Sequence, residues 1–570
     1  MHAHLSFALP ALLLGCGLRA QADFVPVRGS ELREHIEAWV ADRGSVSRRH
    51  SAPLSKLRRE RLFRLHEDWL GRVRRLDFAK LSRDGQVDWL LFDNHLRRQL
   101  ADLGLEHARD REVLALVPWA TTVVELVEAR QAVEPLDPAA AAKTLDALVA
   151  TIDASTSAMK TQKPNASVAL RAANRLGAVR RALGEWFRFR DGYDPLFSWW
   201  LRKPHEAADA AIARSERFLR EECVGKAADG GEPLVGDPLG RDALLSELRF
   251  ELIPYSPEEL VQLAEREFAW CDAEFEKAAT ELGFAGDWHK AQEHVKGLHV
   301  GPGEQTRLIQ ELAREAVAFL DERDLLTIPD LARETWRMEM MSPARQLVNP
   351  FFLGGESIIV SFPTDTMAHA DKMQSMRGNN VHFSRATVQH ELIPGHHLQQ
   401  FTQARCRPYR EVFDTPFWVE GWALYWEMRL YDMGFAKIAA DRVGMLFWRK
   451  HRCARIVFSL RYHLGEWNPQ QCIDYLVERV GHERANATAE VRRSIVGNYG
   501  PLYQAGYMLG GLQLRALQRE LVGGGKLSER AFHDRVLQQN SIPIELVRAA
   551  LTDAPLSPTF QSSWRFYEVK

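Results

Sequence analysis

One short run of the chain, HELIPGHHLQ (390–399), gathers residue types that bind metal ions. His390 is followed directly by Glu391, and His396 lies six positions after the first histidine. In the zinc-peptidase pattern HExxH, two histidines four residues apart lie on one helix face and share a single metal ion. Here Pro394 and Gly395 stand between the histidines, so the strict pattern is broken. The sequence therefore predicts a modified form of this metal site.

The proline predicts how the pattern is modified. Pro394 inside a helix removes one hydrogen bond and clashes with the carbonyl of His390, so we expect a kink or bulge at Pro394–Gly395. A two-residue bulge would bring His396 to the place of the second histidine of HExxH. On an unbroken helix His396 would lie about 240° around the axis from His390, on a different face. His397 would lie on the same face as His390 but about 10 Å along the axis, too far to share a metal with bonds of about 2.1 Å. We predict His390 and His396 as ligands, with His397 as the alternative.

A third ligand is expected downstream, because a catalytic zinc ion takes three protein ligands and leaves one position for water. The acidic candidates are Glu411, Asp414, Glu420 and Glu427. The segment 417–427 predicts a buried apolar helix, in which a carboxylate must be paired or bound to metal. Glu420 is the predicted ligand, and Glu427, on the same face, is the predicted partner that orients a histidine. The other two are predicted to be solvated.

The same residues suggest a reaction. Glu391 stands beside a metal ligand, where a general base that takes a proton from water would have to lie. Stabilising an oxyanion needs a further donor, and the candidates are Tyr507, Tyr503, Tyr499 and His463, each of which is also explained as a packing residue. A metal site without peptidase activity, either inactive or acting on another amide, stays open. The presence of Glu391 argues against the inactive form, since metal binding alone needs no base there.

The elements that must position these residues are mostly helices. Apolar residues recur at three- and four-residue steps in segments that predict an N-terminal bundle of long antiparallel helices, at 57–76, 87–105, 139–159, 168–189 and 204–223. Residues 225–240 predict a loop, and Ser256 with Pro257 predicts a helix start. Only 357–362 has strand character; it is either an edge that holds extended substrate or a buried connector.

Length and composition set the broad class. With 570 residues, 46% hydrophobic and 26% charged, the chain predicts a globular protein of two helical lobes, 23–300 and 301–570. A net charge of −2 gives no reason to expect nucleic acid as partner. Five cysteines follow residue 22 without a C-x-x-C spacing, so neither a cysteine zinc site nor a redox pair is predicted. The sequence does not fix disulfide pairing, oligomeric state or substrate.

The first residues predict export. The apolar run 5–18 is too short to span a bilayer, and Ala20-Gln21-Ala22 is typical of cleavage after Ala22, so residues 1–22 are predicted to be a signal peptide. Leu13-Leu14-Gly15-Cys16 also resembles a bacterial lipobox, which would place a lipid anchor on Cys16 instead. A buried N-terminal segment is the third interpretation, because the first residues lack Lys and Arg. No later stretch predicts a transmembrane span.

HELIPGHHLQ followed by WVEGWALYWE (418–427) resembles the bacterial family called domain of unknown function 885. The resemblance continues through 461–476, 489–493, 507–510 and 532–544. That family is grouped with gluzincin-type zinc metallopeptidases, and its members look like distant, mostly helical relatives of angiotensin-converting enzyme and thimet-type oligopeptidases.

The resemblance implies a mostly α, two-lobed architecture with a central cleft and a small β element before the metal-binding helix. It implies Zn²⁺-dependent hydrolysis of short peptides. Together with the leader, this predicts a protein that is periplasmic or anchored as a lipoprotein facing the periplasm. In this comparison Gly395-His396 matches the relatives' Gly-His, Glu420 the third ligand, and Tyr507 the oxyanion donor. The family often reads Pro-Gly-Gln where this chain has Pro501-Leu502-Tyr503, so substrate preference is not carried over.

Overall fold

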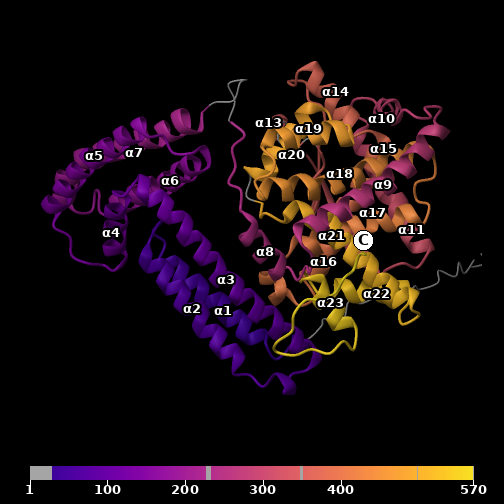
Figure 1. The fold of residues 1–570 in the computed structure, drawn as a ribbon, viewed down its shortest axis with the longest axis horizontal. Helices are drawn as coiled ribbons and strands as arrows, with labels where there is room; N and C mark the ends of the chain where they lie inside the picture. Colours follow the sequence, from indigo (N-terminus) through magenta and orange to yellow (C-terminus); the bar gives the residue numbers. More distant parts are fainter. Residues whose placement is uncertain (1–28, 226–232, 347–348, 350, 497–498, 569–570) are drawn as a thin grey trace, which may run out of the picture.

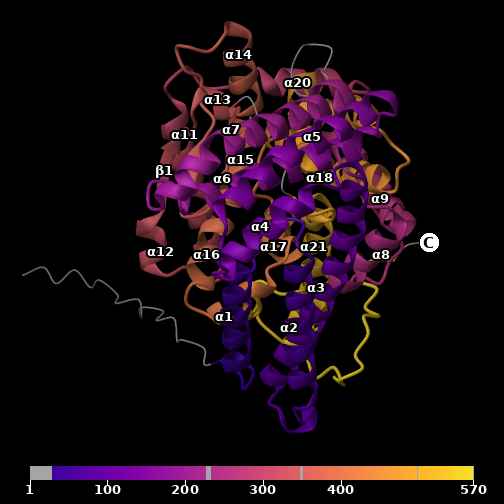
Figure 2. The same ribbon diagram turned by 90° about the vertical axis from the view of Figure 1, so that its left-hand side faces the viewer.

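The computed structural model describes residues 29–225, 233–346, 349, 351–496 and 499–568. Residues 29–225 fold into seven helices and two short turns of helix: α1 (Arg33–Arg49), α2 (Lys56–Arg74), η1 (Phe78–Lys80), α3 (Arg83–Leu116), α4 (Ala120–Gln131), α5 (Pro138–Thr161), α6 (Ala166–Arg188), α7 (Pro195–Phe218) and η2 (Leu219–Val224). They form an elongated arm to one side of a larger helical body (Figure 1, Figure 2).

The rest of the chain forms that body. Its elements are α8 (Arg241–Phe250), α9 (Pro257–Glu281), α10 (Trp288–Lys296), α11 (Gln305–Glu322), α12 (Asp330–Thr335), β1 (Arg337–Met340), α13 (Pro343–Gln346), β2 (Ser357–Val360), α14 (His369–Gly378), α15 (Val381–Glu391), α16 (His396–Gln403), η3 (Pro408–Phe413), α17 (Pro416–Asp432), α18 (Ala439–His463), α19 (Pro469–Val480), α20 (Arg484–Ile495), α21 (Tyr503–Gln518), η4 (Arg519–Gly523), α22 (Glu529–Leu537) and α23 (Ile544–Leu551). The predicted mostly α fold is confirmed.

The helices enclose two large hydrophobic cores. One core lies within the outer arm, from the end of α3 to α7. The other joins the body to α1, α2 and the first half of α3. The 34 residues of α3 connect the two, with Leu103 in the main core and Val113 in the outer one. Helix α9 packs on α18, so the division between the cores does not fall at the predicted lobe boundary at residue 300.

Local signals explain where most helices begin. Ser256 caps α9 in a capping box with Glu259, which confirms the predicted helix start. The prediction of a helix beginning at residue 204 is wrong, because α7 begins at Pro195, where the Asp194 side chain accepts the first free amides, and continues through Pro204. The apolar period alone does not show that the helix extends back to Pro195.

The small β element lies before α15, as predicted. Strand β1 pairs in parallel with β2, with Arg337 opposite Ser357 and Met340 opposite Val360. On the other side of β2, Ile359 forms an antiparallel bridge with Leu353. This small sheet packs beside α11 and α15 through a third hydrophobic cluster that includes Ile358 and Val388.

The site-bearing helices α17 and α21 approach each other closely. A Cβ placed on Gly421 would lie 2.6 Å from the Cα of Gly510, so both positions need glycine for this distance. The approach brings the start of α21 beside the first turns of α17, and with it Tyr503 beside Glu420.

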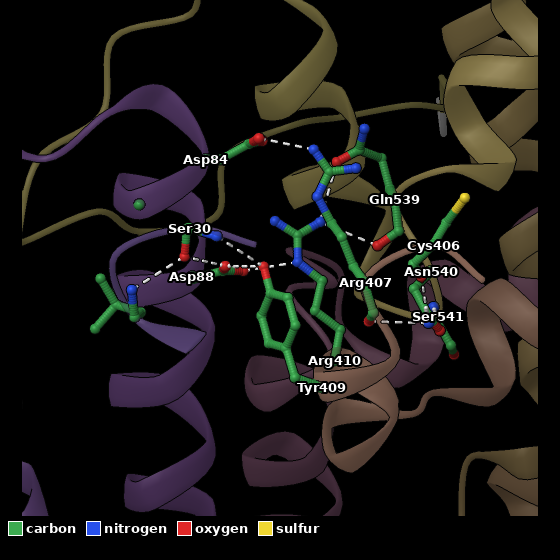
Figure 3. A network of polar contacts seen from close by, with 12 residues as sticks. Ser30, Asp84, Asp88, Cys406, Arg407, Tyr409, Arg410, Gln539, Asn540 and Ser541 are labelled. Carbon is green, nitrogen blue, oxygen red and sulfur yellow. Dashed lines mark hydrogen bonds and ion pairs between the residues drawn. The ribbon is translucent and has the colours of Figure 1, made fainter. Parts of the chain in front are cut away.

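The arm is joined to the body by a buried ionic network (Figure 3). Asp88 on α3 and Arg410 on η3 are both fully buried and form an ion pair of 2.7 Å. Asp88 also accepts hydrogen bonds from Tyr409 (2.6 Å) and Ser30 (2.5 Å). Arg407 contacts Asp84 at 2.7 Å. Because Arg407 and Arg410 follow shortly after α16, the network also holds the chain just beyond the C-terminal end of that helix.

Replacing Asp88 with asparagine is expected to lower the free energy of unfolding by about 3–5 kcal/mol, because it leaves the buried Arg410 charge without its partner. Tyr409→Phe, which removes the hydrogen bond to Asp88 and the longer one from the Ser30 amide but keeps the ion pair, should cost only about 1.5–3 kcal/mol. Urea unfolding followed by circular dichroism measures both. Equal effects of the two changes would show that the ion pair contributes nothing beyond a hydrogen bond.

No helix of the described residues is long and apolar enough to cross a membrane. The leader, including Cys16, lies outside the described residues. The five cysteines that the structure describes are all free.

Candidate metal centre

The Pro394–Gly395 segment interrupts the helix at the predicted place. Helix α15 ends at Glu391 and α16 begins at His396, with Leu392 and Gly395 outside helical geometry. The Gly395 amide donates to the carbonyl of Gln389 (3.0 Å), and a Cβ on Gly395 would lie 1.8 Å from the carbonyl oxygen of His390. Only glycine allows this approach, so the inserted residues fold tightly back onto the end of α15.

A tryptophan of α17 contacts the inserted segment. The indole Nε1 of Trp422 donates to the carbonyl of Pro394 at 2.8 Å. Trp422 is fully buried, so it cannot exchange this partner for water. The helix that carries Glu420 thus also holds the distortion that places His396.

The two predicted histidine ligands lie together. Their ring centres are 4.8 Å apart, and His390, Glu391 and His396 each offer a ligand atom within 4.8 Å of the others. Glu420 Oε2 lies 3.6 Å from Nε2 of His390 and 3.2 Å from Nε2 of His396. Since both imidazoles direct their Nε2 atoms at Glu420, we take that carboxylate as the third donor. Glu391, at the end of α15, lies beside the site and is not assigned as a ligand.

The other ring nitrogens are occupied. Nδ1 of His390 donates to Glu427 at 2.6 Å, and Nδ1 of His396 donates to the Gln399 side chain at 3.2 Å. These partners fix each ring and direct Nε2 toward the shared point, as the outer partners of metal-bound histidines do. Glu427 lies where the sequence analysis expected it.

Burial and charge shape the ionisation of the cluster. Burial alone would lower the pKa of His396, but the charge of Glu420 and a hydrogen bond with it raise this pKa to about 9. Burial would raise the pKa of Glu420, yet His396 and His390 bring it well below its ordinary value. Burial raises the pKa of Glu391. The cluster therefore favours positive charge beside Glu420, which a metal cation also supplies.

The cluster faces a cavity of about 360 Å³. His390, Glu391, His396 and Glu420 all line it, together with Tyr503, Tyr507 and the segment that precedes β2. Two larger cavities, of about 600 and 670 Å³, lie elsewhere and contain none of the candidate ligands. The smaller cavity is thus the place where a ligand would meet the cluster.

Two tyrosines of α21 reach the cluster. Tyr503 donates a short hydrogen bond to Oε1 of Glu420. The Tyr507 ring stacks on His390, with ring centres 6.2 Å apart and planes at 13°. Burial raises the pKa of Tyr507, so its phenol keeps its proton at neutral pH. Both can donate hydrogen bonds near the candidate metal position. Tyr499 lines the same cavity beside Tyr503.

Other candidates lie apart from the cluster. Nε2 of His397 donates to the carbonyl of Ala332 at 2.8 Å, so this ring points toward α12. His463, at the end of α18, does not line the cavity, and burial lowers its pKa to about 4. Glu411 and Asp414 are exposed, as expected for solvated residues.

Several site residues escaped the sequence analysis. Four arginines line the cavity: Arg345, Arg452, Arg455 and Arg493. Gly354 lies so close to Glu391 that a Cβ on it would be 2.8 Å from the Glu391 Cα. Two features of the sequence could have indicated these residues: the Gly-Gly pair at 354–355, and the basic residues within the otherwise apolar helix α18.

The donor set fits a metal ion. Two imidazole nitrogens and one carboxylate oxygen converge in a buried cluster, and each histidine has an outer partner on its second nitrogen. Two histidines and a glutamate form one of the usual ligand sets of catalytic zinc. The fold and the site together define a mostly helical protein with a buried histidine–glutamate centre at the wall of a cavity.

The chain belongs to the family described as "Bacterial protein of unknown function (DUF885)", which matches residues 41–551. Two solved structures share the fold. A "putative lipoprotein of unknown function" from Shewanella oneidensis has a TM-score of 0.65 at 15% identity, covering 91% of this chain and 98% of that one. A "putative lipoprotein" from Colwellia psychrerythraea has a TM-score of 0.55 at the same identity and coverage. A search of curated proteins finds no significant match.

Proposed function

We propose that this protein is a zinc-dependent peptidase of the gluzincin type. The observation that carries the proposal is the convergence of Nε2 of His390 and Nε2 of His396 on Glu420 Oε2, with Glu391 beside them. Metal binding alone explains His390, His396 and Glu420. It leaves Glu391, a buried glutamate at the cavity wall, without a role. A general base gives Glu391 that role.

In this mechanism His390, His396 and Glu420 would hold the zinc ion, which when bound would polarise a water molecule and the substrate carbonyl. Glu391 takes the proton of the water and passes it to the leaving amine. Its raised pKa suits both steps, because burial favours the protonated carboxyl. Residues 351–354 line the same cavity, with Gly354 against Glu391, and offer a surface for an extended peptide.

Tyr507 is the proposed donor to the oxyanion that forms on the substrate carbonyl. It is buried in the cavity wall, protonated, and stacked on the His390 ring. Tyr503 has a different role in the proposal, because its hydroxyl already donates to Glu420 and so orients that carboxylate.

We also propose that the protein is exported, as a periplasmic protein or as a lipoprotein anchored through Cys16. The leader-like residues 1–22 support export. The Shewanella and Colwellia structures, whose names call them lipoproteins, are compatible with the second form.

Mass-spectrometric profiling of cuts in a peptide library tests the peptidase function. We expect cleavage by the purified protein, its loss after treatment with a chelator, and its return when zinc is added. Bound zinc without any cut would contradict the proposal and indicate a metal-binding protein without peptidase activity. Cleavage that the chelator leaves unchanged would contradict the role of the metal.

A further inference from the structure

Three buried or half-buried arginines stand next to the candidate metal centre in the same cavity. Arg452 and Arg455 come from α18 and Arg493 from α20. The guanidinium carbons of Arg452 and Arg455 lie 4.5 and 4.4 Å from the centre of the Tyr507 ring, and this ring stacks on His390. Arg452 and Arg455 are thus separated from the His390 ring by a single aromatic ring, and Arg493 lies over the neighbouring Tyr499 ring.

Two carboxylates form ion pairs with these arginines among the described residues, while Glu391 and Glu420 of the same cavity belong to the candidate metal centre. Glu490 binds Nε of Arg455 at 2.7 Å, and its other oxygen lies 3.8 Å from Nε of Arg493. Arg452 lies 3.6 Å from Oε1 of Glu427, but that oxygen already accepts from Nδ1 of His390 at 2.6 Å. Nε2 of His451 also lies 3.9 Å from Glu490. Among the ion pairs of the described residues, these two glutamates are therefore shared by three guanidinium groups and two histidines.

Several guanidinium nitrogens are buried without a hydrogen-bond partner among the described residues. They are Nε of Arg452, Nη1 of Arg455 and Nε of Arg493. Arg452 and Arg455 are only 5% and 3% exposed, so bulk water does not replace the missing partners. A buried, unpaired charged donor is costly, and a planar guanidinium matches a carboxylate with two parallel hydrogen bonds. The guanidinium groups that line the cavity therefore supply the charge for an anionic group, and their burial strengthens its attraction.

We propose, on the basis of the peptidase function above, that these arginines bind a carboxylate of the substrate and select bonds near it. The Tyr507 ring centre lies 6.2 Å from that of His390 and 4.4 Å from the Arg455 guanidinium. An extended chain advances about 3.5 Å per residue. The carboxylate thus lies one to three residues from the bond at the metal centre. It is the free C-terminus of a short peptide or the side chain of an Asp or Glu residue.

Binding to a catalytically disabled protein tests the carboxylate site without relying on turnover. Zinc-loaded Glu391→Gln protein is titrated calorimetrically with N-acetylated Ala-Ala-Ala, with its C-terminal amide, and with the amide of Ala-Ala-Glu. We expect amidation of Ala-Ala-Ala to weaken binding at least tenfold. Restoration by Ala-Ala-Glu amide would assign the site to an acidic side chain as well, and no restoration would assign it to the C-terminus.

Variants of the arginines connect this preference to the site. Arg452→Gln should reduce the difference between the free acid and the amide to less than twofold, and Arg493→Gln serves if the first variant fails to fold by circular dichroism. Arg442→Gln is the matched control, because Arg442 lies on the same helix but pairs with Glu281 outside the cavity. It should keep the preference.

The outcomes separate the two proposals. Equal binding of acid and amide, or a preference that survives both arginine changes, would overturn the carboxylate site even if the wild-type protein cleaves peptides. A preference for the acid that depends on the arginines would support the site even if the wild-type protein cuts none of the library, in which case the peptidase function alone would fail.

Discussion

Replacing Glu391 with glutamine is expected to lower peptide cleavage by about 10²- to 10⁴-fold, the range that a general base contributes. Glutamine has nearly the shape of glutamate, so the tight packing against Gly354 is kept. It cannot take a proton from water. Zinc content should stay unchanged, because His390, His396 and Glu420 are all retained. Single-turnover cleavage of one library peptide, with metal analysis of the same sample, measures both quantities.

The control is Glu411→Gln, which changes an exposed glutamate of the same region outside the cavity. It should cleave at the wild-type rate. Turnover by the Glu391 variant within a few-fold of that control would remove the general base from the mechanism. A joint loss of zinc and activity would instead assign Glu391 to the metal, as its position within 4.8 Å of the histidine ligand atoms allows.

Local chemistry explains why much of the helical fold could be predicted. The spacing of apolar residues predicted most N-terminal helices, and the capping residue Ser256 predicted the start of α9. Both signals lie within a few residues of one another. The predicted start of α7 is wrong, since the apolar period does not mark the first turns, where the Asp194 side chain caps the helix. The two cores could not be predicted, because α3 enters both and nothing in its periodicity marks where one core ends.

The structure also shows which parts of the site depended on local and which on distant contacts. The interruption at Pro394–Gly395 follows from steric rules within a single turn, so it could be predicted. The hydrogen bond from Trp422 to Pro394 joins residues 28 positions apart. Arg452 and Arg455 looked like ordinary charges of a helix, because only the packing of α18 against α9, α15 and α21 buries them.

Alanine substitutions of the three histidines are expected to affect zinc binding unequally. His390→Ala and His396→Ala should each abolish stoichiometric zinc binding, because each removes one of the three proposed donors. His397→Ala should keep the metal, since this ring donates to the carbonyl of Ala332 and faces away from the cluster. Zinc per protein after extensive dialysis, measured by mass spectrometry, distinguishes the three variants.

Glu427→Gln extends this series to the partner of a ligand. It keeps the size of the side chain that holds Nδ1 of His390 but removes its charge. Loss of such an outer partner typically weakens metal binding by about 10- to 100-fold. The Glu427 variant should therefore lie between the His397 variant and the two ligand variants in a competition with a zinc chelator. If His397→Ala released the metal and His396→Ala did not, the folded-back Pro394–Gly395 segment would not be the feature that completes the site.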